Sequence, residues 1–117
     1  MPRYAILEHD YPVVHWDFLL EADQVLQTWR LAAPPAVGQV ISAVSLPAHR
    51  RLYLDYEGPV SGNRGQVVRW DAGVFTWLSR EQDRLAVQLD GHRLHGMAAL
   101  ERVQDDAWSF LFTPSEK

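Results

Sequence analysis

Turn signals recur roughly every 8 to 12 residues along this chain, and this spacing constrains the fold more than any other feature of the sequence. The clearest signal is Ser61-Gly62-Asn63-Arg64-Gly65, and Pro34-Pro35 and Asp90-Gly91 mark two others. Between the turns lie short apolar segments, several of which alternate between two faces as a β-strand does. No segment combines helix caps with helical periodicity. The sequence therefore predicts an all-β protein.

Ten segments carry the pattern of short strands. They are residues 4–7, 13–21, 25–31, 40–46, 51–56, 66–70, 74–78, 85–89, 94–102 and 107–112. Many short strands with regular turns are typical of a barrel or a sandwich. We expect a small antiparallel β-barrel of about eight to ten short strands with little helix. Because 117 residues can bury one core, we expect a single domain over residues 1–112 and a disordered tail over 113–117.

The absence of cysteine excludes disulfide scaffolds, thiolate zinc sites and cysteine nucleophiles. No apolar run approaches the roughly 18 to 20 residues that span a bilayer, and the opening Met1-Pro2-Arg3-Tyr4 is unlike a secretory signal. We therefore expect a cytoplasmic protein with no membrane partner.

The segment from His9 to Asp17 contains the candidate metal ligands of the chain. Residues two apart in a strand point to the same face, so His15 and Asp17 are expected side by side, with Cα atoms about 7 Å apart. The Pro12 corner can fold the chain back so that His9 supplies a third ligand. Two imidazoles and one carboxylate suit manganese, iron or zinc, and three protein ligands leave positions open for water and substrate. The alternative interpretation is that these histidines bind no metal, because five His residues scattered at random along a chain often include a close pair.

A longer series of motifs covers nearly the whole chain, in order and with close spacing. It runs His9-Asp10-x4-His15-Trp16-Asp17-Phe18-x-Leu20-Glu21, Asp23-x-Val25-Leu26-x-x-Trp29, His49-x3-Tyr53-x-Asp55-Tyr56-Glu57-Gly58, Trp70-Asp71-x-Gly73 and Leu89-x-Gly91-x-Arg93-Leu94-x-Gly96-x-x-Ala99-Leu100, before a late Trp108. This series resembles the signature of the 3′-phosphoesterase domain of bacterial ATP-dependent DNA ligase D and its stand-alone relatives.

The resemblance implies a fold, a reaction and a set of site residues. The fold is a small phosphoesterase-like β-barrel. The reaction is metal-dependent processing of DNA 3′ ends in non-homologous end joining, in which a terminal ribonucleoside and then the remaining 3′-phosphate are removed to leave a 3′-OH. His9, His15 and Asp17 match the metal ligands of the family, with manganese as the expected ion and zinc or another transition metal as alternatives. His49 and Tyr53 match a catalytic histidine and tyrosine, which would share one face of a strand.

The chain departs from the family pattern where that pattern binds phosphate. The pattern has an arginine two residues after the ligand Asp17, and this chain has Leu19 there. Leucine cannot form the bidentate phosphate contacts of a guanidinium. A lysine of the pattern falls at Ala33, and a second arginine falls near Ile41. The metal ligands are therefore retained while much of the phosphate-binding set is lost.

Several functions fit these residues. The first is a divergent 3′-phosphoesterase, in which Arg3, Arg50 or Arg51 binds phosphate from another direction. The alternative is a catalytically impaired relative that acts as a metal-holding module for nucleic-acid ends or a protein partner. A third interpretation uses His15, Asp17 and His49 as a facial triad for iron and dioxygen, although no cosubstrate pattern accompanies it. The expected partners are 3′ ends of DNA or RNA-tipped DNA, with ligase, polymerase or end-binding proteins as separate chains.

The net charge of −4 argues against an extended grip on duplex nucleic acid. Residues 49–80 nevertheless carry five basic and three acidic residues, and the flanking segments are acidic. We therefore expect a short contact at a nucleic-acid end, with a weak affinity that falls steeply as salt rises.

Overall fold

The structure, a computed structural model, describes residues 1–116 and consists almost entirely of β-strands. The strands are β1 (Arg3–His9), β2 (His15–Ala22), β3 (Val25–Leu31), β4 (Val40–His49), β5 (Gly58–Pro59), β6 (Gln66–Arg80), β7 (Arg84–Gly91), β8 (His95–Gln104) and β9 (Ala107–Pro114). A 3-10 helix, η1 (Arg51–Leu54), lies between β4 and β5. Within the described residues, no helix has the length and apolar character needed to cross a membrane.

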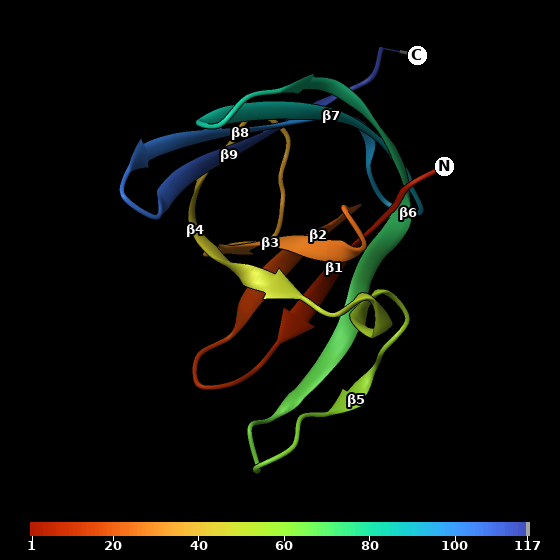
Figure 1. The fold of residues 1–117 in the computed structure, drawn as a ribbon, viewed down its shortest axis with the longest axis vertical. Coiled ribbons are helices and arrows are strands. Elements are labelled where there is room, and N and C mark those ends of the chain that lie inside the picture. Colours follow the sequence, from red (N-terminus) through yellow and green to blue (C-terminus); the bar gives the residue numbers. More distant parts are fainter. Residues whose placement is uncertain (117) are drawn as a thin grey trace.

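Eight of the strands close into an antiparallel barrel (Figure 1). The order around the barrel is β1-β2-β3-β4-β9-β8-β7-β6, and β6 pairs with β1 to complete the ring. The short β5 pairs with the start of β6 outside the ring. Closure occupies the strand edges that an open sheet would leave exposed. The expected small antiparallel β-barrel with little helix is confirmed.

Strand β6 is one strand of 15 residues, whereas the sequence pattern predicts two strands at 66–70 and 74–78. The chain does not turn between them, because the pairing of β6 with β1 continues through this region. Gly73 also lies directly opposite Gly91 of β7 and approaches its backbone closely. A bulge against β1, where the register shifts between Ile6 and Leu7, bends the strand instead. The first part of β6 consequently extends below the barrel together with β5 (Figure 1).

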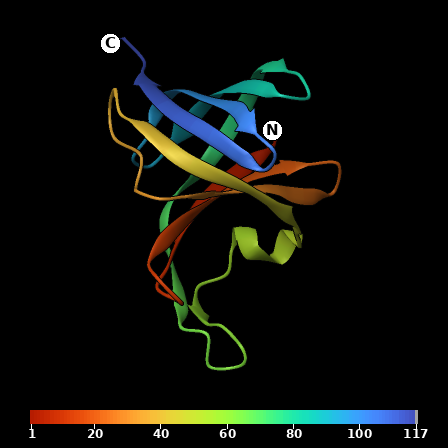
Figure 2. The same cartoon turned by 90° about the vertical axis from the view of Figure 1, so that its left-hand side faces the viewer.

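The segment after β4 also differs from its prediction. The alternation of residues 51–56 predicts a strand, but η1 occupies most of this segment. The pairing of β4 with β9 ends at Val44, and its pairing with β3 ends at His49, opposite Leu26 near the start of β3, so the chain after His49 runs beyond its neighbouring strands. It forms local backbone hydrogen bonds instead and crosses the outside of the barrel (Figure 2). Its buried residue, Leu54, packs onto the outer wall.

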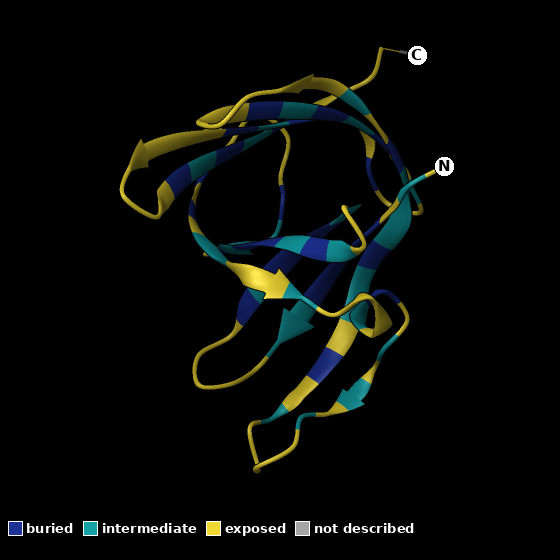
Figure 3. Ribbon diagram, in the orientation of Figure 1, coloured by how far each residue is buried: buried dark blue, intermediate teal, exposed yellow. Residues whose placement is uncertain are grey.

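Two apolar clusters hold the strands together. Buried residues recur along most strands of the barrel (Figure 3). The larger cluster fills the barrel and includes Phe18, Phe75 and Phe110, which are almost fully buried. The smaller, which we call the outer cluster, lies on the outer face beneath η1. It consists of Ala5, Leu7, Leu19, Leu26, Leu54 and Val67. Because successive strand residues point to opposite faces, β1 and β2 contribute to both clusters.

The chain stays in the sheet beyond Phe112, where the sequence predicts that the domain ends. Strand β9 continues to Pro114, and Thr113 pairs with Met97 of β8. The Ser115 amide donates a hydrogen bond to the His95 carbonyl. Residues 113–115 of the expected tail are thus attached to β8, and Lys117 lies outside the described residues.

Candidate metal centre

The β1–β2 hairpin brings together the three predicted metal ligands. His9 is the last residue of β1, His15 is the first of β2, and the two pair directly across the hairpin. Asp17 pairs with Leu7, two residues further from the turn. His15 and Asp17 are two positions apart on β2, so both side chains point to the outer face that carries the outer cluster.

The three side chains lie within reach of one ion. Each offers one ligand atom, and these atoms all lie within 4.8 Å of one another. The rings of His9 and His15 meet edge to face with centroids 4.9 Å apart, and His15 Nε2 is 3.7 Å from Asp17 Oδ2. His15 and Asp17 are each only 6% exposed. Within residues 1–116, this group of ligand atoms does not extend to a fourth histidine or carboxylate.

Backbone carbonyls orient both imidazoles. His15 Nδ1 lies 2.8 Å from the Val13 carbonyl, and His9 Nε2 lies 2.8 Å from the Arg64 carbonyl. In the neutral rings these nitrogens donate, which leaves His15 Nε2 and His9 Nδ1 as acceptors. His15 Nε2 is buried and has no hydrogen-bond partner among the described residues. An unpaired buried acceptor is costly, and a bound cation would satisfy it.

The electrostatics of the site favour the metal-binding form of His15. Burial lowers the pKa of His15 below its ordinary value, and this effect outweighs the Val13 carbonyl and the Asp17 charge, which act in the opposite direction. The neutral imidazole is the form that binds metal ions. With the unpaired Nε2 and the two-histidine, one-carboxylate donor set, the residues present fit a divalent transition metal with open coordination positions.

The predicted catalytic residues His49 and Tyr53 lie next to each other, but not on one strand as the sequence predicts. His49 ends β4, and Tyr53 belongs to η1, so the two do not share a strand as the sequence pattern predicts. The turn of η1 brings their rings together edge to face, with centroids 5.9 Å apart. His49 pairs with Leu26 and Tyr53 packs against the outer cluster, which places both on the face that carries Asp17.

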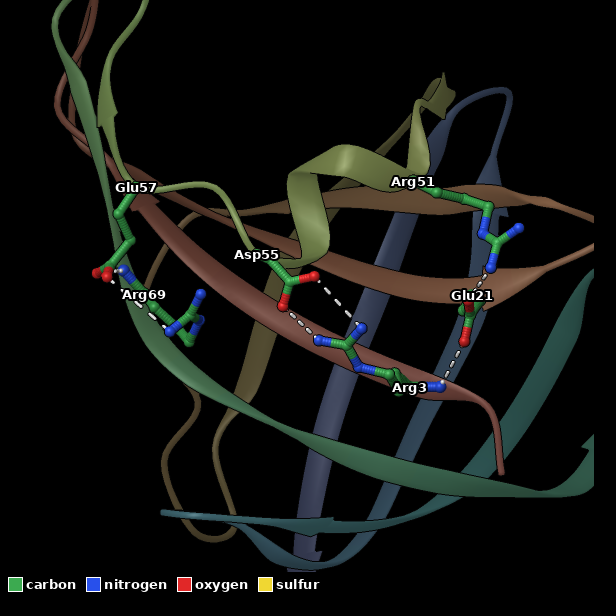
Figure 4. Close-up of polar contacts among 6 residues, drawn as sticks. All are labelled: Arg3, Glu21, Arg51, Asp55, Glu57 and Arg69. Atoms are coloured by element: carbon green, nitrogen blue, oxygen red, sulfur yellow. Dashed lines mark hydrogen bonds and ion pairs between the residues drawn. The ribbon is translucent and has the colours of Figure 1, made fainter.

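The predicted phosphate-binding arginines are largely engaged with carboxylates (Figure 4). Arg3 forms an ion pair with Asp55 and holds the pKa of that carboxyl below its ordinary value. Arg51 lies 3.1 Å from Glu21, which also accepts a hydrogen bond from the Arg3 amide. These contacts tie η1 and the residues that follow it to β1 and β2. Arg50 differs, since its guanidinium lies 6.0 Å from the Tyr53 ring.

Sequence reasoning missed Arg30, the cation beside the predicted ligands. Arg30 on β3 pairs directly with Asp17, and its Nε lies 3.5 Å from Asp17 Oδ1. A signal for this contact exists in the sequence. The hairpin joining β2 and β3 has a two-residue turn, Asp23-Gln24, and both residues have positive φ. Such a turn fixes the register of the strands, so counting outward from it places Arg30 opposite Asp17.

A groove of about 370 Å³ opens beside the metal centre. His15 and Arg30 line it together with Val13, Val14, Ser42 and Val44. Val13 and Val14 are among the exposed large apolar residues of the molecule. The groove gives a small molecule or a chain end access to the side of the site where Arg30 lies.

Comparison with known proteins identifies similar sequences. The profile of the DNA ligase D 3′-phosphoesterase domain matches residues 7–102. The chain is 33% identical over 111 residues to the multifunctional non-homologous end joining protein LigD of Pseudomonas aeruginosa. It is 31% identical over 116 residues to the multifunctional non-homologous end joining DNA repair protein LigD of Mycobacterium tuberculosis.

Both matches cover most of this chain but only a small share of the relative's length. They take in 86% and 90% of this chain, but only 13% and 15% of the Pseudomonas and Mycobacterium proteins. The chain therefore corresponds to one small part of each relative.

Proposed function

Because the chain belongs to the family of DNA ligase D 3′-phosphoesterase domains, we propose that it is a metal-dependent phosphoesterase that processes DNA 3′ ends in end-joining repair. It removes a 3′-terminal ribonucleoside and then the remaining 3′-phosphate. The product is a 3′-OH end that a ligase can seal. We further propose that the protein acts in the cytoplasm.

The observation that carries this proposal is the cluster of His9, His15 and Asp17. Its ligand atoms lie within 4.8 Å of one another, and His15 Nε2 is buried without a partner among the described residues. A structural histidine would normally have both nitrogens satisfied or exposed. The donor set suits manganese, zinc or another divalent transition metal.

The chain's own residues divide the work of hydrolysis in the following way. Bound at this cluster, a divalent metal supplies polarisation of a phosphoryl oxygen and activation of water. His9, His15 and Asp17 hold it, and the Val13 and Arg64 carbonyls keep the imidazoles oriented. His49 donates a hydrogen bond or proton to the phosphate ester, and the Tyr53 hydroxyl, beside His49, donates to a phosphate oxygen. The substrate phosphate would lie on the outer face beside the metal ligands.

The relatives suggest the setting in which the reaction takes place. Both are named as multifunctional end-joining proteins, and this chain matches only a small part of each. We propose that its partners are 3′ ends of DNA or RNA-tipped DNA, and that ligase, polymerase or end-binding activities act on the same ends. The net charge of −4 favours a contact confined to the end itself.

One observation favours a second candidate, a catalytically impaired relative that holds a metal and binds nucleic-acid ends. Leu19, at the position of a phosphate-binding arginine in the family pattern, is fully buried in the outer cluster. Arg3 and Arg51 are paired with carboxylates. A protein that had lost all its phosphate contacts would still bind metal but would not hydrolyse the ester.

A primer-extension assay separates the two candidates. The protein is incubated with manganese and a primer–template that ends in a 3′-phosphate, which blocks extension, and a DNA polymerase then reports the ends that have been converted to 3′-OH. We expect wild-type protein to make the 3′-phosphate primer extendable, Asp17→Asn to fail, and the exposed-site control His95→Ala to match wild type. Manganese binding without any extendable product would support the impaired relative.

A further inference from the structure

The position of Arg30 points to a phosphate subsite that the family pattern does not predict. Arg30 lies on β3 directly opposite Asp17, one strand away from the metal ligands on β2. In the family pattern the corresponding cation follows Asp17 on its own strand. Leu19 fills that position here with no exposed surface, so a phosphate cannot reach it.

The surroundings of Arg30 leave its guanidinium open to a ligand. Its side chain is 40% exposed, whereas the side chain of its neighbour Asp17 is 9% exposed. Within residues 1–116 its ion pair with Asp17 runs through Nε at 3.5 Å, which is long for a hydrogen bond. The two terminal amino groups can therefore turn toward a ligand in the groove, where Arg30 is the one cationic lining residue among those described.

The other candidate arginines are less available to bind a phosphate. Arg3 and Arg51 form ion pairs with Asp55 and Glu21 at the end of the outer face near η1. Arg50 lies against the Tyr53 ring. Binding a phosphate at Arg3 or Arg51 would first require breaking a carboxylate pair, whereas Arg30 keeps donors free beside the metal ligands.

We propose that Arg30 forms the phosphate subsite of this protein, and that it binds the terminal 3′-phosphate from β3 in place of the family's arginine at the Leu19 position. This inference rests on the proposed function for the identity of the ligand, a phosphate at a nucleic-acid 3′ end. A guanidinium at this point binds the phosphate oxygens with two N–H donors and offsets charge that builds up in the transition state.

A binding experiment that needs no turnover tests the subsite. The probe is a fluorescein-labelled primer–template with a 3′-terminal phosphonate, in which carbon replaces the ester oxygen, and the reference is the same duplex ending in 3′-OH. Anisotropy gives both affinities in saturating manganese. We expect wild type to prefer the phosphonate, and Arg30→Gln to lose about tenfold to a hundredfold of this preference. Arg30→Lys keeps the positive charge but loses the bidentate guanidinium, so its preference for the phosphonate should lie between those of wild type and Arg30→Gln.

Two further measurements distinguish phosphate binding from a purely structural role. Manganese affinity of Arg30→Gln should equal or exceed that of wild type, because a cation beside the site is removed. Arg84→Gln, which removes an exposed arginine on β7, should behave as wild type in both assays. The proposal is overturned if Arg30→Gln keeps the full phosphonate preference. It is equally overturned if manganese affinity falls in step with that preference, since Arg30 would then only hold Asp17.

The result is independent of whether the protein hydrolyses its substrate. If wild type prefers the phosphonate and Arg30→Gln does not, the subsite stands even where the extension assay finds no product. If the extension assay succeeds and Arg30→Gln is unchanged in both binding and rate, the subsite fails while the proposed function stands.

Discussion

At the scale of single residues, the outer face of β2 combines chemistry with packing at alternate positions. His15 and Asp17 present ligand atoms, and Leu19, next along the same face, packs in the outer cluster under Leu54 of η1. That His15, Asp17 and Leu19 share one face could be predicted, because side chains alternate strictly along a strand. The burial of Leu19 could not be predicted, because the outer cluster includes Leu54 of η1, which is distant in the sequence.

Restoring the family's arginine at position 19 should therefore destabilise the fold. Leu19→Arg places a charge in a fully buried apolar site, and we expect it to lower the free energy of unfolding by at least about 3 kcal/mol. Urea unfolding measures the change. Val68→Arg, at a position 55% exposed on β6, is the matched control and should stay within about 0.5 kcal/mol of wild type. Equal unfolding midpoints for both variants would show that Leu19 is not part of a core.

At the scale of elements, two hairpins meet at the metal centre. The hairpin of β1 and β2 supplies the ligands, and the β5–β6 hairpin supplies the Arg64 carbonyl that orients His9. Asp10 Oδ1 accepts a hydrogen bond from the Gln66 amide at 2.9 Å, which adds a side-chain contact to the pairing of β1 with β6. The site is therefore a property of the paired hairpins, although all three ligands come from one of them.

Gly65 is the residue that permits this junction. Its φ is +75°, and a Cβ there would collide with the Asp10 carboxylate and the Tyr11 side chain. We expect Gly65→Ala to lower the free energy of unfolding by more than about 1 kcal/mol and to weaken manganese binding, because His9 and Asp10 are displaced. Gly38→Ala isolates the backbone effect, since its φ is +73° and nothing lies within 4 Å of the added Cβ.

Calorimetric titration with manganese compares the two glycine variants. Both should be less stable than wild type, but only Gly65→Ala should bind manganese more weakly. If the two variants bind manganese equally well, the junction of the hairpins does not support the site.

The strands and η1 also show which parts of the fold can be predicted from sequence patterns. The strands flanking the site were predictable because their alternation and turns are local. The alternation of residues 51–56 predicts a strand, but η1 forms there because the strands that pair with β4 do not extend past His49. Arg30 was missed because no alternation within β3 shows what lies across from it, although the two-residue turn after β2 fixes that register.

At the scale of the whole molecule, one buried carboxylate secures the closure of the barrel. Asp71 on β6 is 2% exposed and accepts hydrogen bonds from the Tyr4 hydroxyl on β1 and from the amides of Arg93 and Leu94. The motif Trp70-Asp71-x-Gly73 is thus explained by the fold. Tyr4 pairs across the seam at which β6 completes the ring.

This seam gives the molecule a specific response to alkaline pH. Burial and the hydrogen bond to Asp71 raise the pKa of Tyr4 above its ordinary value. Below about pH 10 the hydroxyl is neutral in both states and its contribution to stability is complete; above it, ionisation in the unfolded chain favours unfolding. We expect Tyr4→Phe to be less stable by about 1.5–3 kcal/mol at neutral pH.

Above about pH 10, wild type should lose stability faster than Tyr4→Phe, by roughly 1.4 kcal/mol per pH unit. Urea unfolding across this pH range measures both curves, and titration of the other groups is common to the two proteins. Parallel curves would mean that Tyr4 ionises as readily in the folded barrel as in the unfolded chain.

The proposed function depends on a metal ion held by His9, His15 and Asp17, and calorimetric titration of manganese into the purified, metal-free protein tests this site most directly. We predict one manganese ion bound per chain, no measurable binding to His15→Ala, and wild-type binding to His95→Ala, which removes an exposed imidazole elsewhere on the barrel. Thermal melts establish that all three proteins are folded. Manganese binding to folded His15→Ala with wild-type affinity would contradict the proposed metal centre and the function built on it.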